Sequence, residues 1–311
     1  AQGYAMTDVT SSTGIAYKHQ ENVFQEFNRE QLIPQMNSTA GPALATADIN
    51  HDGLEDFFIG AARGGKNAVY VQEKNSKFKR IMQPALLLDS NYEDVDAVWA
   101  DLNKDGHLDL VVGSGGNEYF GKDIYMQSRV YLNDGLGNLA KLENAIPVFN
   151  QTSSILTSDF NKDGFPDLFI TSKTVAAQYG MPADSYVLLN TGDGHFKDVT
   201  EKLAPFLTKI GMIANATLAD VNKDGIQEII LSHQWGGIDI VYPKQGVWSK
   251  ATLTDLKGWW NFTTALDIDG DGDLDLIAGN LGLNTRLKST SKEPIRMYYN
   301  DFDDNGSYEQ I

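Results

Sequence analysis

Cysteine is absent from this 311-residue chain, which excludes a disulfide framework and any zinc or iron–sulfur site built on thiolates. Basic residues are few, because 25 Lys and Arg stand against 42 Asp and Glu, and the formal net charge is −17. That charge disfavours nucleic-acid backbones and anionic membranes as partners. No apolar run reaches the about 18 residues that a membrane-spanning helix needs. A hydrophobic content of 41% still supports a sizeable core, which argues against disorder.

The acidic residues recur in one nine-residue pattern. An acid, an Asn or Asp, an acid, a Gly and an acid occupy positions 1, 3, 5, 6 and 9 of five segments, which begin at Asp48, Asp101, Asp159, Asp220 and Asp267. Self-similarity at intervals of about 50 residues is typical of an architecture with one supersecondary unit per repeat.

Short apolar runs on both sides of each acidic segment predict strands. Runs such as Phe57-Phe58-Ile59 follow the last acid, small residues such as Ala43-Leu44-Ala45 precede the first, and hairpin turns such as Asp134-Gly135 come later. These runs are too short for helices and contain β-branched or aromatic residues. The order strand, acidic loop, strand, variable loop, strand, tight turn and strand describes a four-stranded antiparallel blade. The sequence therefore predicts an all-β protein, a β-propeller with five visible repeats.

The acidic segments within four-stranded repeats resemble the FG-GAP/VCBS repeats of integrin-α-like propellers, over roughly residues 40–311. Two phrases, Ala40–Asp48 and Gly279–Asn284, resemble a narrower group, the bacterial extracellular VCBS-repeat proteins similar to cartilage acidic protein. Integrin-type propellers usually have seven blades, so the resemblance favours a partial seven-bladed propeller over a closed five-bladed one.

We expect residues 1–40 to form an N-terminal strand and a lead-in segment, with a short helix over Phe24–Leu32 that Pro34 ends. The blades are predicted at about residues 41–90, 91–150, 151–205, 206–257 and 258–311. Met6–Thr10 resembles Phe196–Thr200, the predicted outer strand of the third blade. Asp301–Gly306 looks like a further acidic loop, but it begins only 34 residues after Asp267. We interpret it as the outer turn of the fifth blade, with metal binding left open.

The acidic segments offer the donors that Ca²⁺ prefers, which takes six to eight oxygen ligands in irregular geometry. Positions 1, 3, 5 and 9 would supply side-chain oxygens, and Gly at position 6 allows the sharp turn. Position 7 varies in residue type, which indicates a main-chain carbonyl ligand. The predicted ligands of about five structural Ca²⁺ ions are Asp48, Asn50, Asp52, Leu54, Asp56, Asp101, Asn103, Asp105, His107, Asp109, Asp159, Asn161, Asp163, Phe165, Asp167, Asp220, Asn222, Asp224, Ile226, Glu228, Asp267, Asp269, Asp271, Asp273 and Asp275.

Other interpretations of these segments have less support. Mg²⁺ demands near-ideal octahedral geometry, and zinc sites use Cys or clustered His. An EF-hand needs flanking helices and a Glu at position 12. Plain acidic turns remain an alternative, since Asp, Asn and Gly are common turn residues. That alternative has most support in the fourth segment, where Glu228 replaces Asp.

The face opposite the acidic loops carries the most distinctive side chains. Aromatic rings suit stacking on sugars or peptides, and neighbouring Arg, Asn or Gln groups suit planar hydrogen bonding. The predicted ligand-binding residues are Arg63, Tyr119, Tyr179, His233, Trp235, Trp259, Trp260 and Arg286. The alternative is that the Trp residues cover the core between blades and that His233 is a satisfied loop residue.

No catalytic motif is present, so the sequence favours a non-enzymatic binding or adhesion module with a glycan or protein ligand. The second hypothesis is a polysaccharide lyase or hydrolase that uses Arg63, His233 or Tyr179, and a scaffold without a small ligand is the third. Extracellular calcium modules bind at about 10⁻⁴–10⁻³ M, which the cytosol does not fill. We therefore expect an extracellular, cell-surface or periplasmic location.

Overall fold

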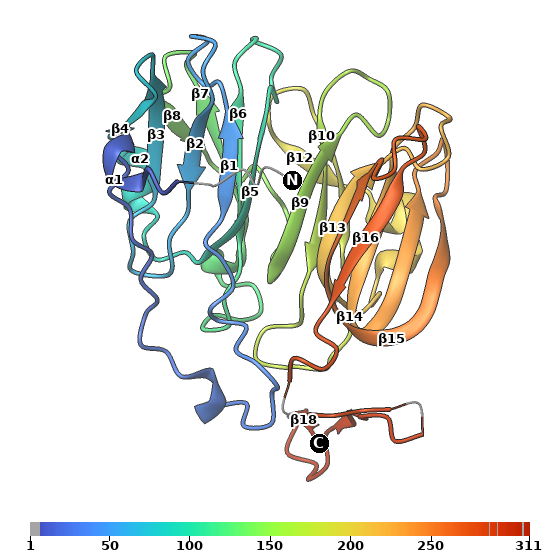
Figure 1. Ribbon diagram of the computed structural model, residues 1–311. Coiled ribbons are helices and arrows are strands. Elements are labelled where there is room, and N and C mark those ends of the chain that lie inside the picture. The colour runs from blue at the N-terminus through green and yellow to red at the C-terminus, as the bar shows by residue number, and fades with distance from the viewer. Residues whose placement is uncertain (1–6, 286, 291, 307) are drawn as a thin grey trace.

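The computed structural model describes residues 7–285, 287–290, 292–306 and 308–311, in which the strands form four four-stranded antiparallel sheets and one two-stranded sheet (Figure 1). The first two sheets contain β1 (Leu44–Ala47), β2 (Asp56–Ile59), β3 (Ala68–Glu73) and β4 (Lys77–Ile81), then β5 (Asp94–Ala100), β6 (Asp109–Ser114), β7 (Arg129–Asn133) and β8 (Leu139–Leu142). The others contain β9 (Thr152–Ser158), β10 (Asp167–Ser172), β11 (Tyr186–Asn190) and β12 (Phe196–Asp198), then β13 (Met212–Ala219), β14 (Glu228–Tyr242), β15 (Ser249–Leu266) and β16 (Asp275–Asn280), and finally β17 (Tyr299–Asn300) and β18 (Glu309–Gln310). The predicted all-β propeller of four-stranded blades is confirmed.

The hydrophobic core lies between successive blades. The innermost strands pack in chain order, β1 on β5, β5 on β9 and β9 on β13. Ala43, Ala45 and Ala47 are buried against the second blade, and such small side chains let neighbouring strands approach closely near the axis. Burial of the larger apolar side chains of each interface is the main term that stabilises the arrangement, at roughly 25 cal/mol per Å² of apolar surface.

Hydrogen bonds from one innermost strand to the next reinforce this packing. The Asp96 carboxylate accepts the N–H of Ile155 at 2.7 Å, and the Ser154 hydroxyl accepts the N–H of Ala216 at 3.1 Å. In each of β5, β9 and β13 the register shifts near these residues, at a β-bulge. A bulge re-aims the side chain that follows it, and here that side chain points at the neighbouring blade.

The fourth sheet continues into a fifth repeat. β14 changes direction near Trp235, where the register shifts. The bend brings His233 Nε2 to within 3.3 Å of Asp239 Oδ2. An extended strand would separate residues six apart by about 20 Å. β15 runs through residues 257 and 258, where the sequence places a blade boundary, and its second part pairs with β16. β15 is thus shared between the fourth and fifth repeats.

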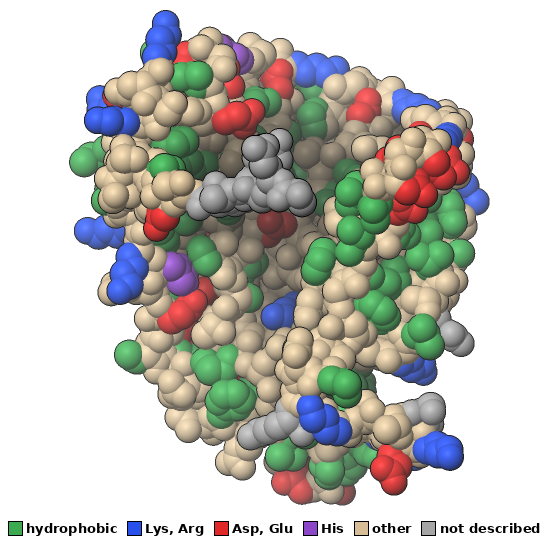
Figure 2. All heavy atoms as spheres, in the orientation of Figure 1, with side chains coloured by type: hydrophobic (Ala, Val, Ile, Leu, Met, Phe, Trp, Pro, Cys, Tyr) green, Lys and Arg blue, Asp and Glu red, His purple; other side chains and the backbone are tan. Residues whose placement is uncertain are grey.

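The face of β15 and β16 that points away from the fourth blade is open among the described residues. Phe58, Val111, Phe169 and Ile230 occupy equivalent positions in the earlier blades and are 0% exposed, whereas Ile277 is 41% exposed. Phe262 and Leu266 of β15 are also exposed, and Figure 2 shows hydrophobic side chains spread over this side of the molecule. The described blades therefore form an arc rather than a closed ring.

Two short helices, α1 (Thr10–Thr13) and η1 (Glu26–Asn28), precede the first strand. Others lie between later strands: α2 (Pro84–Leu88), η2 (Ile124–Met126), α3 (Thr200–Leu203) and η3 (Pro205–Leu207). Asp8 and Asp198 each accept the N–H of the Thr two residues later, at the start of α1 and α3. The likeness of these two segments is therefore the turn that leads into a helix. Residues 7–9 of the predicted N-terminal strand form no strand, and the residues before them lie outside the described part. No helix among the described residues is long and apolar enough to cross a membrane.

The predicted helix over Phe24–Leu32 is wrong. Only Glu26–Asn28 forms a turn of 3₁₀ helix. The physical reason is tertiary, because the Glu26 carboxylate accepts the N–H groups of Asn37 and Ser38 at 2.6 and 2.8 Å and folds the segment into a compact loop.

Candidate functional site

The five acidic segments form loops at one end of the blades, the upper end in Figure 1. In the first loop Asp48 accepts the N–H groups of Asp52 and Gly53, and Asp52 accepts the N–H of Leu54 at 2.9 Å. The next three loops repeat these bonds with their own residues, so position 5 orients position 7 in every case. In the fifth loop Asp267 accepts from Gly270 and Gly272. The loops are therefore closed by their own side chains.

The acid at position 9 is buried beneath each of the first four loops. Asp109 Oδ2 accepts the N–H of Leu102 in its loop, and Oδ1 accepts the N–H of Asn133 at the end of β7. Asp56 and Asp167 make the same two bonds, and Glu228 makes the bond to its own loop. Burial raises the pKa of Asp109 and of Asp167 to about 6, and a bound cation would offset that effect.

In the fifth loop the side chains at positions 1, 3 and 9 converge. Oxygens of Asp267, Asp269 and Asp275 lie within 4.8 Å of one another. Carboxylate oxygens from positions 1 and 9 with an amide or carboxylate oxygen from position 3 are hard donors that suit Ca²⁺. Each carboxylate oxygen that accepts one N–H keeps a second lone pair, so the residues present fit the predicted ion.

A sixth loop repeats this arrangement between β17 and β18. Asp301 accepts the N–H groups of Asn305 and Gly306, and the Phe302 N–H donates to Glu309. Carboxylate oxygens of Asp301, Asp303 and Glu309 also lie within 4.8 Å of one another. The sequence indicates an outer turn here, because the segment begins only 34 residues after Asp267, and it leaves metal binding open. Its flanking strands and its bonds are those of the other acidic loops.

On the opposite face, Arg63 and Tyr119 lie together between the first two blades. The Arg63 guanidinium lies 4.7 Å from the centre of the Tyr119 ring and donates to Glu118 at 3.0 Å. The Tyr119 ring contacts Tyr125, with centres 4.6 Å apart. Arg63 and Tyr119 are half-buried, so a stacked ring and a paired guanidinium are both accessible.

The remaining predicted ligand residues lie around the third to fifth repeats. The Trp235 indole donates to the Tyr179 hydroxyl at 2.8 Å and packs edge-on against Trp259, with ring centres 5.1 Å apart. Tyr179 is 2% exposed and His233 is 8% exposed, with its imidazole beside Asp239. Trp260 packs against the core between the fourth and fifth repeats. Arg286 lies outside the described residues.

A segment that the sequence leaves without a role, Gln25–Ser38, crosses this face, and we call it the strap. Glu26, which is 0% exposed, anchors it by accepting from the backbone of Asn37 and Ser38 and from the Asn117 amide of the second blade. Burial lowers the pKa of the Lys173 ammonium, and the Glu26 charge opposes that shift. No pattern in the sequence marks Glu26, because its partners are distant backbone and amide groups.

A second buried carboxylate fixes the other part of the strap. Glu30 accepts the Asn117 amide at 2.6 Å and the N–H of Tyr179 at 2.8 Å. Ile33 is buried with Tyr179 and Met212. The strap therefore joins the second, third and fourth blades, and Tyr179 lies beneath it rather than on an open surface.

Glu93 lies beside Arg63 and makes the stability of the folded chain depend on pH. One of its oxygens accepts the Arg63 N–H at 2.9 Å and the other has no hydrogen-bond partner among the described residues. Burial raises the pKa of Glu93 from 4.5 to about 8. Between these values the unfolded chain releases a proton that the folded chain retains, so Glu93 lowers stability as the pH rises.

We therefore expect Glu93→Gln to be more stable than the wild type by about 1 kcal/mol or more at pH 8, with no such gain at pH 4. Urea unfolding of both proteins at fixed calcium concentration from pH 4 to 8.5 measures the difference. Parallel pH profiles for the two proteins would contradict the buried, protonated state of Glu93.

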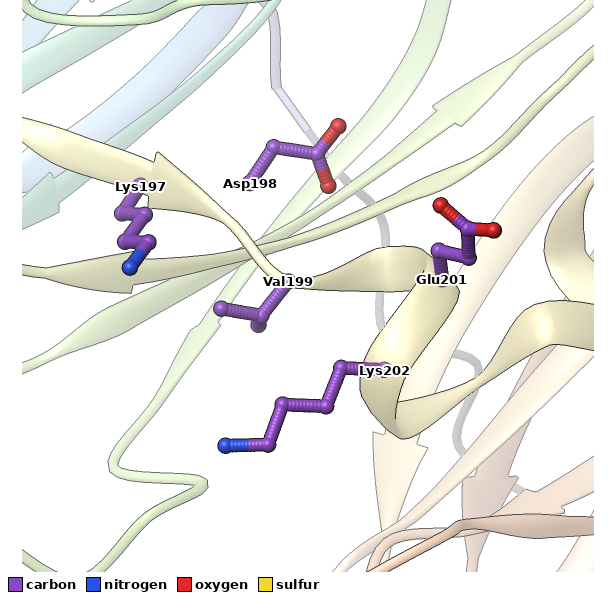
Figure 3. A pocket seen from close by; sticks show the side chains of 5 residues that line it. All are labelled: Lys197, Asp198, Val199, Glu201 and Lys202. Atoms are coloured by element: carbon purple, nitrogen blue, oxygen red, sulfur yellow. The ribbon is translucent and has the colours of Figure 1, made fainter.

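One open groove among the described residues lies at the outer edge of the third blade. Lys197, Asp198, Val199, Glu201 and Lys202 line an open groove of about 530 Å³ where β12 leads into α3 (Figure 3). Figure 3 shows both carboxylates on one side of this groove and both ammonium groups on the other. The charges balance and no aromatic ring lines the groove, so it does not resemble the predicted ligand face.

Comparison with known proteins identifies the repeat. Residues 48–112 match the FG-GAP-like repeat, a span that runs from the first acidic loop into β6. The phosphatidylinositol-glycan-specific phospholipase D of Mus musculus is 30% identical over 148 residues, which are 43% of this chain and 17% of that protein. The chain thus matches less than one fifth of the length of this relative. These two matches do not bear on the narrower resemblance to cartilage acidic protein.

One solved structure shares the architecture. An Agrocybe aegerita lectin that recognises non-reducing terminal N-acetylglucosamine has a TM-score of 0.50 and 18% identity, over 75% of this chain and 59% of that one. A thermostable family-43 glycoside hydrolase has a TM-score of 0.41 and 8% identity, over 89% of this chain and 96% of that one. At 18% identity the likeness to the lectin concerns the fold alone.

Proposed function

We propose that this protein is a calcium-stabilised extracellular propeller that binds a glycan without turning it over. The observation that carries the proposal is the division of the blades into two ends. At one end acidic side chains converge in closed loops, and at the other aromatic and planar polar groups lie at the surface. Bound Ca²⁺ would tie each innermost strand to the next strand and relieve carboxylate repulsion.

The ligand surface in this proposal is the part of the opposite face beside the strap. Tyr119 offers a ring for stacking on a sugar, and Arg63 and Glu118 offer planar hydrogen-bonding groups next to it. The Asn22 amide at the edge of the strap donates to Glu118 at 2.7 Å and helps to fix that carboxylate. The similarity to the lectin supports a glycan rather than a protein as the ligand, because a protein of similar fold recognises a sugar.

The alternative of a polysaccharide lyase or hydrolase has less support from the geometry. Burial raises the pKa of Tyr179 to about 12, and its hydroxyl already accepts from Trp235. His233 is buried beside Asp239. A general acid or base must reach the substrate, and these two candidates face the interior.

We expect Tyr119→Ala and Arg63→Ala each to weaken glycan binding at least tenfold, because each removes a contact at the centre of the surface. Glycan-array screening would identify the ligand, and calorimetry would compare the variants with Lys202→Ala in the distant groove as the control. Release of unsaturated sugars from a polyanionic glycan would contradict a pure binding role. Equal glycan affinities in all variants would mean that the glycan binds at another site.

A further inference from the structure

Three pairs of successive acidic loops touch through the same two positions. The side chain at position 4 of one loop meets the side chain at position 7 of the next. His51 meets His107, Lys104 lies 3.9 Å from the centre of the Phe165 ring, and Lys223 pairs with Asp273. Position 4 has a positive φ in the first four loops, 59° at His51 and 58° at Lys104, which aims the side chain outward. The fold makes this contact, and residue identity decides its chemistry.

At the first of these contacts the fold brings two imidazoles together. His51 Nε2 and His107 Nδ1 are 3.0 Å apart, and the ring centres are 5.2 Å apart. His51 is exposed and His107 is half-buried, so the pair is open to solvent. Two nitrogens that bind one metal at about 2.05 Å with a right angle between them lie about 2.9 Å apart, which agrees with the observed distance.

The His107 ring is held in place by its surroundings. A side chain at Gly135, in the hairpin turn of the same blade, would lie 2.3 Å from His107 Cε1, so the glycine makes room for the ring. On the other side the ring meets His51. A ligand that is oriented before the metal arrives loses less entropy on binding.

We propose that His51 and His107 form a site for a divalent transition metal of the Ni²⁺, Cu²⁺ or Zn²⁺ class, distinct from the calcium proposed for the loops. Imidazole suits these ions, whereas Ca²⁺ takes oxygen ligands. In the hydrogen bond between the rings one nitrogen carries the proton. In the metal complex both facing nitrogens are free of protons, and each ring keeps its proton on its other nitrogen. The nearby acidic loops raise the local concentration of cations, and the bound metal would join the first blade to the second.

The test uses the full chain at saturating CaCl₂, titrated with NiCl₂ by calorimetry. We expect one equivalent of Ni²⁺ to bind, and His51→Asn or His107→Leu to weaken that binding at least tenfold. Asn tolerates the positive φ at position 51, and Leu stands at position 7 of the first loop. His195→Gln is the matched control, since His195 is another half-buried histidine and lies beside the Asp193 carboxylate, and it should leave the affinity unchanged.

A transplanted pair tests the geometric claim directly. Lys104→His combined with Phe165→His puts imidazoles at the second of these contacts, and we expect a second Ni²⁺ equivalent. Electron paramagnetic resonance with Cu²⁺ should show two coupled nitrogens in the wild type and one in each single variant. The proposal would be overturned if the wild type does not bind Ni²⁺. It would also be overturned if His51→Asn and His107→Leu both bind Ni²⁺ as tightly as the wild type.

Discussion

Removal of calcium with EGTA is expected to lower the melting temperature by about 10–20 °C, reversibly on addition of CaCl₂. Each ion that binds only the folded chain adds about 2.7 kcal/mol when its free concentration is 100 times its Kd, and five loops contribute together. In addition, the carboxylates that converge in each loop repel one another once the cation leaves. Tryptophan fluorescence during a thermal ramp measures the shift.

Mg²⁺ is the control for this experiment, because it keeps its waters and demands octahedral geometry. We expect MgCl₂ at the same concentration to restore only a small part of the lost stability. A melting temperature that EGTA leaves unchanged, in protein that elemental analysis finds free of metal, would mean that the acidic loops are plain turns.

The second large effect is expected from Glu26→Ala, which should destabilise the protein by about 3 kcal/mol. The change leaves the N–H groups of Asn37 and Ser38 without their acceptor in a buried place, and the Asn117 amide keeps only Glu30 as an acceptor. It also removes the negative charge that favours the ammonium form of Lys173. We therefore expect the strap to detach from the second and third blades before the blades unfold.

Hydrogen exchange and limited trypsin digestion distinguish local release from global unfolding. Exchange should accelerate over Gln25–Ser38, and trypsin should cut after Arg29 in Glu26→Ala while the blades stay protected. Glu201→Ala, at an exposed glutamate of α3, is the matched control and should behave as the wild type. Unchanged exchange across the strap in Glu26→Ala would contradict its role as the anchor.

The blades could be predicted because the strands, loops and turns of each repeat are determined by residues close together in the sequence. Strand residues such as Phe57-Phe58-Ile59, the loop pattern around Gly53 and the turn at Asp134-Gly135 need no information from elsewhere in the chain. The sharing of β15 between two repeats could not be predicted in the same way. This sharing depends on register shifts where β14 and β15 bend together, and no residue pattern in the sequence predicts those shifts.

The candidate site was only partly predictable for a related reason. Spacing identified the acidic loops, since all of their proposed ligands lie within nine residues. The opposite face is assembled from residues far apart in the chain, such as Glu30 with Tyr179 and Arg63 with Glu118. The sequence therefore predicted Tyr179 and His233 as surface groups. In the structure Tyr179 lies beneath the strap, and His233 is buried beside Asp239.

Calorimetric titration of metal-free protein with CaCl₂ tests the central claim most directly. The account predicts about five equivalents of Ca²⁺, or six if the loop from Asp301 to Glu309 also binds, with affinity lost as the pH falls and protons compete for the carboxylates. Binding of one equivalent or none to correctly folded protein would contradict it.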